Sequence, residues 1–259
     1  MNFRASRQLI VIALVGLFVV GVGFLVVKPL IPKPSCSDNK QNQNEEEADC
    51  GGPCIPCVFK HQKDVEVFWT RFVKVRGNTY DVAAEIRNPN VKLAAAHFDY
   101  EFKLFDETGF LVASRRGTSF IYPGETVRLA EVGIMSGRIV RNTSITFENF
   151  KWILTEAPSP DIIAGNREYI IESGDGARAS VVKALISNRM LIDLPEIEVS
   201  ALAFDERGNL LGVNRTILRQ VLAGETKAVR FSWPIVFSED VSSLAVEARS
   251  RIAIPLEAQ

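Results

Sequence analysis

Histidine is scarce in this chain, whose 259 residues include only His61 and His97. Imidazole is the usual general base and metal ligand near neutral pH, so chemistry of either kind has few candidates here. The sequence also lacks a Gly-x-Ser-x-Gly elbow, a glycine-rich phosphate loop and a His-Glu-x-x-His motif. We therefore predict that the protein is not an enzyme.

An excess of charge of either sign is also missing. Lys and Arg number 30 against 31 Asp and Glu, which gives a formal charge of −1. Nucleic-acid binding normally needs a basic patch, and this composition does not indicate one. Because 47% of the residues are hydrophobic, the chain has material for buried cores. Its length allows about two domains of roughly 100–200 residues each.

Cysteine is absent outside one stretch, residues 36–57, which holds Cys36, Cys50, Cys54 and Cys57. Such confinement fits disulfides formed in an oxidising compartment. Two alternatives are an iron–sulfur cluster on the Cys50-x3-Cys54-x2-Cys57 spacing and a zinc site completed by His61. The β-rich segments that follow argue against the first, and the acidic neighbours argue against the second. Four cysteines allow three pairings, and spacing does not choose among them.

The loop between the first two cysteines is rich in side-chain oxygen atoms, from Asp38, Asn42, Asn44, Glu45 and Asp49. Carboxylate and amide oxygens at close spacing are the ligands that Ca²⁺ prefers. These five residues are therefore our candidate calcium ligands. The alternative is that they are solvated side chains of a spacer.

Together with Gly51 and Gly52, this stretch resembles a short cysteine-rich module of bacterial secreted and surface proteins. The module has the form C-x-D-x3-N-x-[DN]-E-x3-D-C-G-G-x-C-x2-C, and the chain matches every defined position. It departs at Asn39 and at Glu46-Glu47, where the module often has glycine. The resemblance implies disulfides and a bacterial surface location, and it implies no enzymatic function.

Residues 9–27 form a long apolar run without a charged or polar side chain. As a helix, the run would span roughly the 30 Å hydrocarbon core of a membrane. No small-x-small cleavage site follows it, which favours an uncleaved signal-anchor over a signal peptide. Basic residues flank both ends, so the positive-inside rule does not set the orientation. The cysteines do, because they place the bulk of the chain outside the cytoplasm.

Behind the module, the sequence predicts β-strands. Phe98, Tyr100, Phe102 and Leu104 alternate with charged residues, the pattern of a half-buried strand. Val82, Ala84 and Ile86 alternate in the same way with Asp81, Ala83 and Glu85. Turns are indicated at Asn88-Pro89-Asn90, Asp106–Gly109 and Pro123-Gly124-Glu125. We assign Trp69, Phe147, Trp152 and Trp233 to the cores or their rims.

The pattern recurs about 100 residues later, which indicates duplicated domains and not a solenoid. Phe105-Asp106-Glu107-x-Gly109 is repeated as Phe204-Asp205-Glu206-x-Gly208, and Gly124-Glu125-Thr126 as Gly224-Glu225-Thr226. Asn88 has its counterpart in Asn188. In the second copy, Ile197, Val199, Ala201 and Ala203 line the alternating strand. The order of these features resembles the FxLYD-type domain, an immunoglobulin-like sandwich of bacterial envelope proteins.

The prediction is an all-β protein with two tandem immunoglobulin-like antiparallel β-sandwiches behind one transmembrane helix and a short disulfide-rich stalk. The expected parts are a cytoplasmic N-terminus (1–8), the anchor (9–27), the stalk (28–63), a first sandwich (64–158) and a second (159–259). We expect a single-pass membrane protein with envelope proteins as partners, acting as a scaffold, adhesion module or assembly subunit. The alternative is a sensory ectodomain that responds to a ligand or Ca²⁺ and acts through a membrane partner. No other cofactor is expected.

Overall fold

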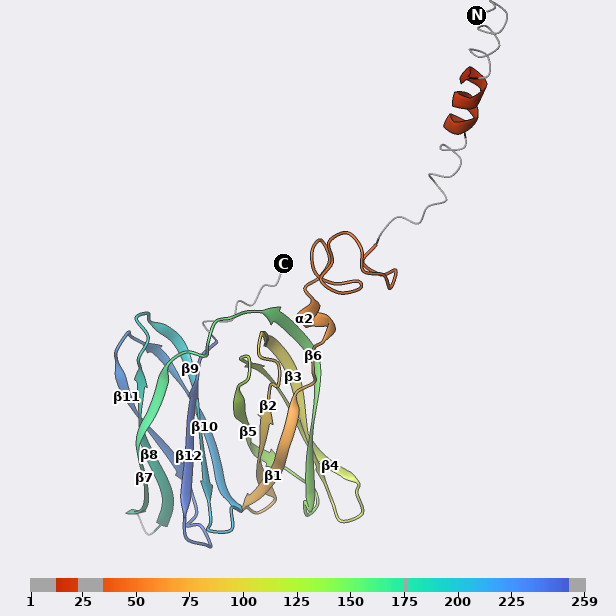
Figure 1. Cartoon of the computed structure of the whole chain (residues 1–259). Helices are drawn as coiled ribbons and strands as arrows, with labels where there is room; N and C mark the ends of the chain where they lie inside the picture. The colour runs from red at the N-terminus through yellow and green to blue at the C-terminus, as the bar shows by residue number, and fades with distance from the viewer. Residues whose placement is uncertain (1–12, 23–34, 175–176, 252–259) are drawn as a thin grey trace, which may run out of the picture. The chain divides into compact units, whose positions relative to one another are not determined.

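The structure is a computed structural model that describes residues 13–22, 35–174 and 177–251. The chain divides into two compact units, Met1–His61 and Gln62–Gln259. In the first unit, a helix covers residues 13–22, and the short helix α2 (Cys57–Lys60) follows the cysteine loop. The regular structure described in the second unit consists of β-strands (Figure 1).

The twelve strands described in the second unit form two successive sets. The first set, the first sandwich, contains β1 (Glu66–Arg76), β2 (Thr79–Arg87), β3 (Leu93–Phe105), β4 (Leu111–Ile121), β5 (Thr126–Met135) and β6 (Asn142–Leu154). The second set, the second sandwich, contains β7 (Ile162–Gly174), β8 (Ala177–Asn188), β9 (Leu194–Phe204), β10 (Leu210–Val221), β11 (Thr226–Trp233) and β12 (Ser243–Arg249).

The strands pair into three-stranded antiparallel sheets. Their orders are β1-β2-β5 and β4-β3-β6 in the first sandwich, and β11-β8-β7 and β10-β9-β12 in the second. Renumbering the second set from its first strand reproduces the topology of the first set. The chain is therefore all-β, and its two halves repeat one arrangement of sheets, as the recurring sequence features indicated.

Each sandwich has its own apolar core between its two sheets. In the first, Tyr80, Val82 and Ile86 of β2 face Phe98, Phe102 and Leu104 of β3, and all are at most 1% exposed. In the second, Ile197, Val199, Ala201 and Ala203 of β9 belong to the core, as their alternation predicted. A bulge in β6 at Asn149, whose φ is 57°, brings both Phe147 and Phe150 against Phe98.

The repeated asparagines fasten one corner of each sandwich. Asn88 is fully buried, and its amide donates to the carbonyl oxygens of Leu93 and Tyr122 at 2.7 and 2.9 Å. Asn188 donates in the same way to the carbonyl oxygens of Ile192 and Val221 at 2.9 and 3.1 Å. A buried amide that satisfies the carbonyls of two separate turns fixes both turns at once.

The Gly-Glu-Thr turns complete these corners. The Glu125 carboxylate accepts from the backbone N–H of Tyr122 at 2.8 Å, and Glu225 accepts from that of Leu222 at 2.7 Å. Gly124 and Gly224 have φ of 67° and 73°, a region that glycine enters without a Cβ clash. The repeated motifs are thus explained by turn geometry.

The predicted anchor is described only at its centre. The side chains of residues 13–22 are exposed, including Leu17 and Phe18 at 73% and 71%. Among the described residues, no helix is both long and apolar enough to cross a membrane. Residues 9–12 and 23–27 of the predicted span lie outside the described part of the chain, so the anchor stays a prediction.

Replacing Asn188 by Ala should lower the free energy of unfolding by about 2–4 kcal/mol, because buried carbonyl groups lose their donor. Asn88→Ala should have a similar effect through the matching corner. Chemical denaturation monitored by tryptophan fluorescence measures both changes. Asn142→Ala is the matched control, since Asn142 is exposed and its side-chain oxygen accepts from the backbone N–H of its neighbour Thr143. Equal stability of all three variants would contradict this role for the corners.

Candidate functional site

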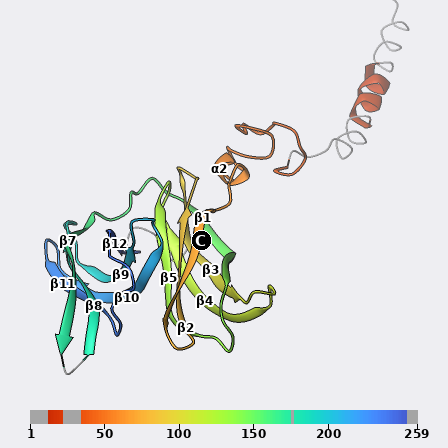
Figure 2. The ribbon, with the colours of Figure 1, turned by 90° about the horizontal axis from the view of Figure 1, so that it is seen from below.

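The two sandwiches are joined by a shared apolar layer. It contains the buried residues Ala83, Ala130, Leu202, Leu210 and Val213, with Trp69, Val73, Val132, Phe204 and Ala245 packed around them. These residues come from every strand of the sheets β1-β2-β5 and β10-β9-β12, which lie next to each other in Figure 2. The layer differs from our expectation for β2, whose outer face was predicted to be solvated. Ala83 has no exposed surface there because the second sandwich covers it, and Asp81, on the same face of β2, is 4% exposed.

One end of this contact is a clamp on β1. Trp69 meets the ring of Phe204 edge-on, with centroids 6.2 Å apart, and the Arg71 guanidinium lies 5.0 Å from the Trp69 ring centroid. The same guanidinium donates to the Gly208 carbonyl in the turn between β9 and β10. Trp69, assigned from the sequence to a core or rim, therefore packs between the sandwiches.

A buried carboxylate, Glu131 of β5, collects hydrogen bonds from both sandwiches. The Tyr100 hydroxyl donates to its Oε1 at 2.8 Å, and Arg215 Nη1 of β10 donates to the same oxygen at 2.8 Å. Burial raises the pKa of Tyr100, and the Glu131 charge adds to the effect. A Cβ on Gly117 would lie 2.3 Å from the Tyr100 ring, so only glycine leaves room for this tyrosine.

A second link joins β5 to β12. Glu247 accepts from the Arg128 backbone N–H at 3.0 Å and from the Arg128 guanidinium, which also pairs with Glu85. At the end of β12, the strap formed by Arg249, Ser250 and Arg251 returns to the first sandwich. There the Tyr122 hydroxyl donates to the Ser250 carbonyl oxygen at 2.8 Å.

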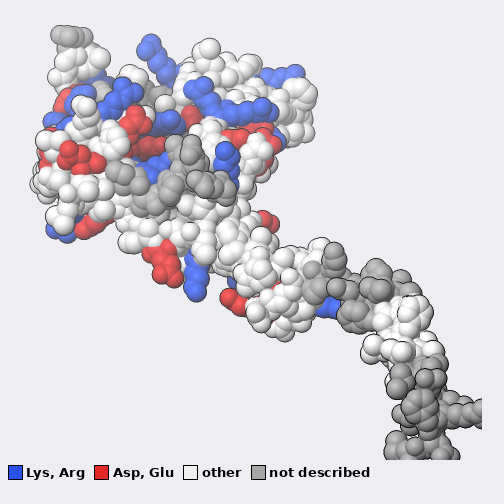
Figure 3. Space-filling view, turned by 90° about the horizontal axis from the view of Figure 1, so that it is seen from above, with Lys and Arg blue, Asp and Glu red and all other residues white. Residues whose placement is uncertain are grey.

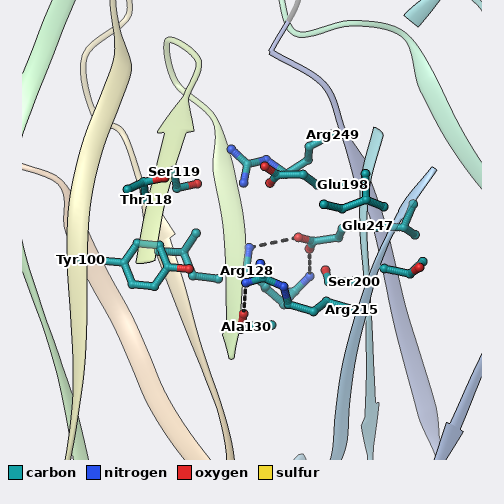
Figure 4. A pocket seen from close by; sticks show the side chains of 14 residues that line it. Tyr100, Thr118, Ser119, Arg128, Ala130, Glu198, Ser200, Arg215, Glu247 and Arg249 are labelled. Carbon is teal, nitrogen blue, oxygen red and sulfur yellow. Dashed lines mark hydrogen bonds and ion pairs between the residues drawn. The ribbon is translucent and has the colours of Figure 1, made fainter. Parts of the chain in front are cut away.

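The cavity at this junction is small. It is lined by both sandwiches, including Tyr100, Ser119 and Arg128 from the first and Ser200, Arg215 and Glu247 from the second (Figure 4). Its volume is about 60 Å³, which suits a few water molecules at 10–15 Å³ or more each and excludes a metabolite-sized ligand. The interface holds the two sandwiches together, and its cavity is too small to serve as a substrate pocket.

Asp81 is a second group whose pKa burial raises. Burial raises its pKa to about 6, against the opposing effect of a hydrogen bond from the Gly133 N–H, which lies 2.8 Å from its Oδ1. Near neutral pH the folded protein therefore carries a buried carboxylate whose charge opposes folding.

In the first unit, the cysteines form two disulfides, Cys36–Cys54 and Cys50–Cys57, and none is free. This confirms the disulfide prediction and selects one of the three pairings. It leaves no thiolate for the zinc or iron–sulfur alternatives. Gly51 and Gly52 have φ of 81° and 58°, and a Cβ on Gly52 would lie 2.5 Å from the Asn44 carbonyl oxygen. Both glycines of the module are therefore required by its fold.

The candidate calcium ligands mainly hold the loop together. Asp49 Oδ1 accepts from the backbone N–H groups of Asp38 and Asn39 at 2.8 and 3.0 Å. Glu45, 6% exposed, accepts from the N–H groups of Asn42 and Asp49 at 3.0 and 3.2 Å. Two clusters of possible metal ligands occur in the described part of this loop: Glu45 with Cys36 and Cys54, and Glu47 with Cys50 and Cys57. In each cluster the two sulfurs already form a disulfide, and neither cluster brings Asp38, Glu45 and Asp49 together. The donor set is thus directed at backbone amides, and calcium binding stays a prediction.

The histidines lie in separate polar pairs. His97 contacts Asp99 at 2.9 Å on β3, and His61 contacts Glu47 at 2.7 Å in the first unit. Asp106 and Asp205 each accept backbone N–H groups of their own hairpin turns, Phe110 at 3.0 Å and Asn209 at 2.7 Å. These acids act as turn formers, as their positions predicted.

Comparison with known proteins gives no family. No family model matches the chain, and no curated protein matches it. Among solved structures, red sea bream transglutaminase aligns over 72% of this chain at 13% identity with a TM-score of 0.22. The alignment spans 29% of the transglutaminase chain. A similarity this weak carries no information about fold or activity.

The raised pKa of Asp81 predicts a specific pH dependence. Because the pKa of Asp81 in the folded protein, about 6, exceeds the usual aspartate pKa of 3.8, the folded state binds the proton more tightly than the unfolded state. The stabilisation of the folded state by this bound proton is complete below about pH 4 and is lost as the pH rises to about 6. Asp81→Asn, which keeps an acceptor for Gly133, should therefore raise the unfolding free energy at pH 7.5 by about 1–3 kcal/mol.

The gain should vanish near pH 4, where the wild-type carboxyl is protonated. Denaturant titrations at several pH values measure it. Asp240→Asn, at an exposed site, should change stability by less than about 0.5 kcal/mol at every pH. A gain for Asp81→Asn that is independent of pH would contradict the assignment.

Proposed function

We propose that this chain is a membrane-anchored extracytoplasmic protein of the cell envelope with a binding or structural role, such as a scaffold, an adhesion module or an assembly subunit. The observation that carries the proposal is the buried layer between the sandwiches. A continuous apolar layer with a clamp, ion pairs and a strap presents two sandwiches as one rigid body. Rigidity of this kind suits a part that positions partners.

Three further observations support the proposal. The helix at residues 13–22 exposes apolar side chains within an uncharged run, as expected of an anchor. Two disulfides in the module fit an oxidising compartment. The face drawn in Figure 3 carries acidic and basic side chains intermixed, which does not favour nucleic acid as a partner of that face. The immunoglobulin-like character of the sandwiches belongs to the same proposal and rests on their repeated antiparallel topology.

The location is tested by fractionation in a bacterial host. The full chain should stay with membranes after carbonate washing, and a variant lacking residues 9–27 should leave them. In intact spheroplasts, external protease should digest the sandwiches. Maleimide should label the cysteines only after reduction, because both pairs are oxidised. A full chain found in the soluble fraction, or free thiols in fresh protein, would overturn the proposed location.

The rigid-body role is tested by calorimetry of the full chain in mild detergent. We expect one unfolding transition for both sandwiches, because each buries surface against the other. Leu202→Asp places a charge in the shared layer and should split the transition in two, while Arg215→Gln should only lower its midpoint. Ile171→Asp, at a site that is already 42% exposed, is the matched control and should preserve one transition. Two independent transitions in the unmodified chain would contradict the proposal.

A further inference from the structure

The internal repeat places two equivalent corners in the molecule, and only one of them is covered. The first corner is formed by Phe120, Tyr122 and Glu125, and the second by Gln220, Leu222 and Glu225. In both corners, Oε2 of the glutamate accepts from the backbone N–H of the residue three positions earlier in the chain. The backbone carbonyl of the same glutamate accepts from the backbone N–H of Asn88 or Asn188 at 2.9 Å. The backbone of the two corners is therefore built alike.

The chain itself covers the first corner with the strap. Arg249 and Arg251 place their guanidinium carbons 4.4 and 4.9 Å from the centroid of the Phe120 ring. Arg249 also donates to the Phe120 carbonyl and lies 3.7 Å from Glu125 Oε1. Phe120, which also packs against Ala94, Ala96 and Tyr122, is 1% exposed. An extended segment with two arginines thus occupies the first corner.

The second corner is open among the described residues. Leu222 is 54% exposed, and the neighbouring turn presents Leu191 and Ile192 at 96% and 48%. A hollow of about 560 Å³ is lined by Asp193, Leu194, Pro195, Gln220, Leu222 and Glu225. A volume of this size accommodates peptide side chains.

The charged side chains that line this hollow are acidic. Its lining includes the carboxylates of Asp193 and Glu225 and no Lys or Arg. Lys227 lies 3.7 Å from Glu225 Oε2, but its ammonium donates to the carbonyls of Arg219 and Gln220 at 3.0 and 2.7 Å. Glu225 Oε1 corresponds to the atom that Arg249 approaches in the first corner, and within the described chain no ion pair uses it.

We propose that the second corner is a docking site for an extended, arginine-bearing segment of a partner protein. An arginine pairs with Glu225 Oε1, as Arg249 does with Glu125, and an apolar side chain covers Leu222. The inference extends the proposed binding role, but it does not depend on membrane attachment. Failure of the docking site would leave the fractionation result unchanged.

The test uses a probe taken from the covered corner. A fluorescein-labelled peptide of residues 246–251, Val-Glu-Ala-Arg-Ser-Arg, is titrated with the full chain in mild detergent, and binding is read by fluorescence polarisation. We expect saturable binding that weakens as salt rises. Glu225→Gln keeps an oxygen for the Leu222 N–H and should weaken binding about fivefold. A peptide with both arginines replaced by Gln should weaken it at least as much.

Further variants make the result decisive. Leu222→Ser should also weaken binding, because it removes the exposed apolar floor, whereas Glu206→Gln, in an exposed turn of the same sandwich, should have no effect. Loss of binding in Glu125→Gln but not in Glu225→Gln would show displacement of the strap and overturn the proposal. Absence of binding would overturn it as well. Self-association in sedimentation that disappears in Glu225→Gln would assign the corner to a second copy, again contrary to the proposal.

Discussion

The contact between the sheets β1-β2-β5 and β10-β9-β12 is the constraint on which the rest of the second unit depends. It covers the face of β2 that points away from the core of the first sandwich, so that Ala83 has no exposed surface. It also supplies a partner for Glu131, which is 7% exposed: Arg215 of the other sandwich pairs with this carboxylate, together with Arg115 of β4. A buried carboxylate without such a partner would be strongly destabilising.

The contact also distinguishes two classes of structural feature, those that both sandwiches share and those that occur in one sandwich alone. Features that serve the interior of a sandwich occur twice, such as Asn88 with Asn188 and Glu125 with Glu225. Features that serve the junction occur once, such as Trp69, Arg71 and Glu131. Because the outward-facing sheets differ, the two copies present different surfaces. Arginines of the strap cover the corner at Phe120, while its counterpart at Leu222 is exposed.

In the cysteine module, too, conspicuous side chains serve the local fold. Its acidic residues turn towards the backbone: Asp49 and Glu45 accept amide N–H groups that the loop would otherwise leave without partners. Two disulfides and two glycines with positive φ then hold the loop closed. A pattern of oxygen-bearing side chains is therefore explained by loop closure without a cation, although the same side chains are chemically suited to one.

The sequence by itself determined the strands, the turns and the duplication, because alternation and turn residues act over a few neighbouring positions. Phe98 to Leu104 and Ile197 to Ala203 line their cores as predicted, and the four cysteines pair. Only the tertiary structure decided which cysteines join, which face of β2 is covered and where Trp69 packs. The cysteine partners are only 18 and 7 residues apart, but spacing allows all three pairings and the fold of the loop selects one. The covering of β2 and the packing of Trp69 depend on surfaces that meet across more than 100 residues of chain, as in the pairing of Arg71 with Gly208, and no local pattern encodes such a meeting.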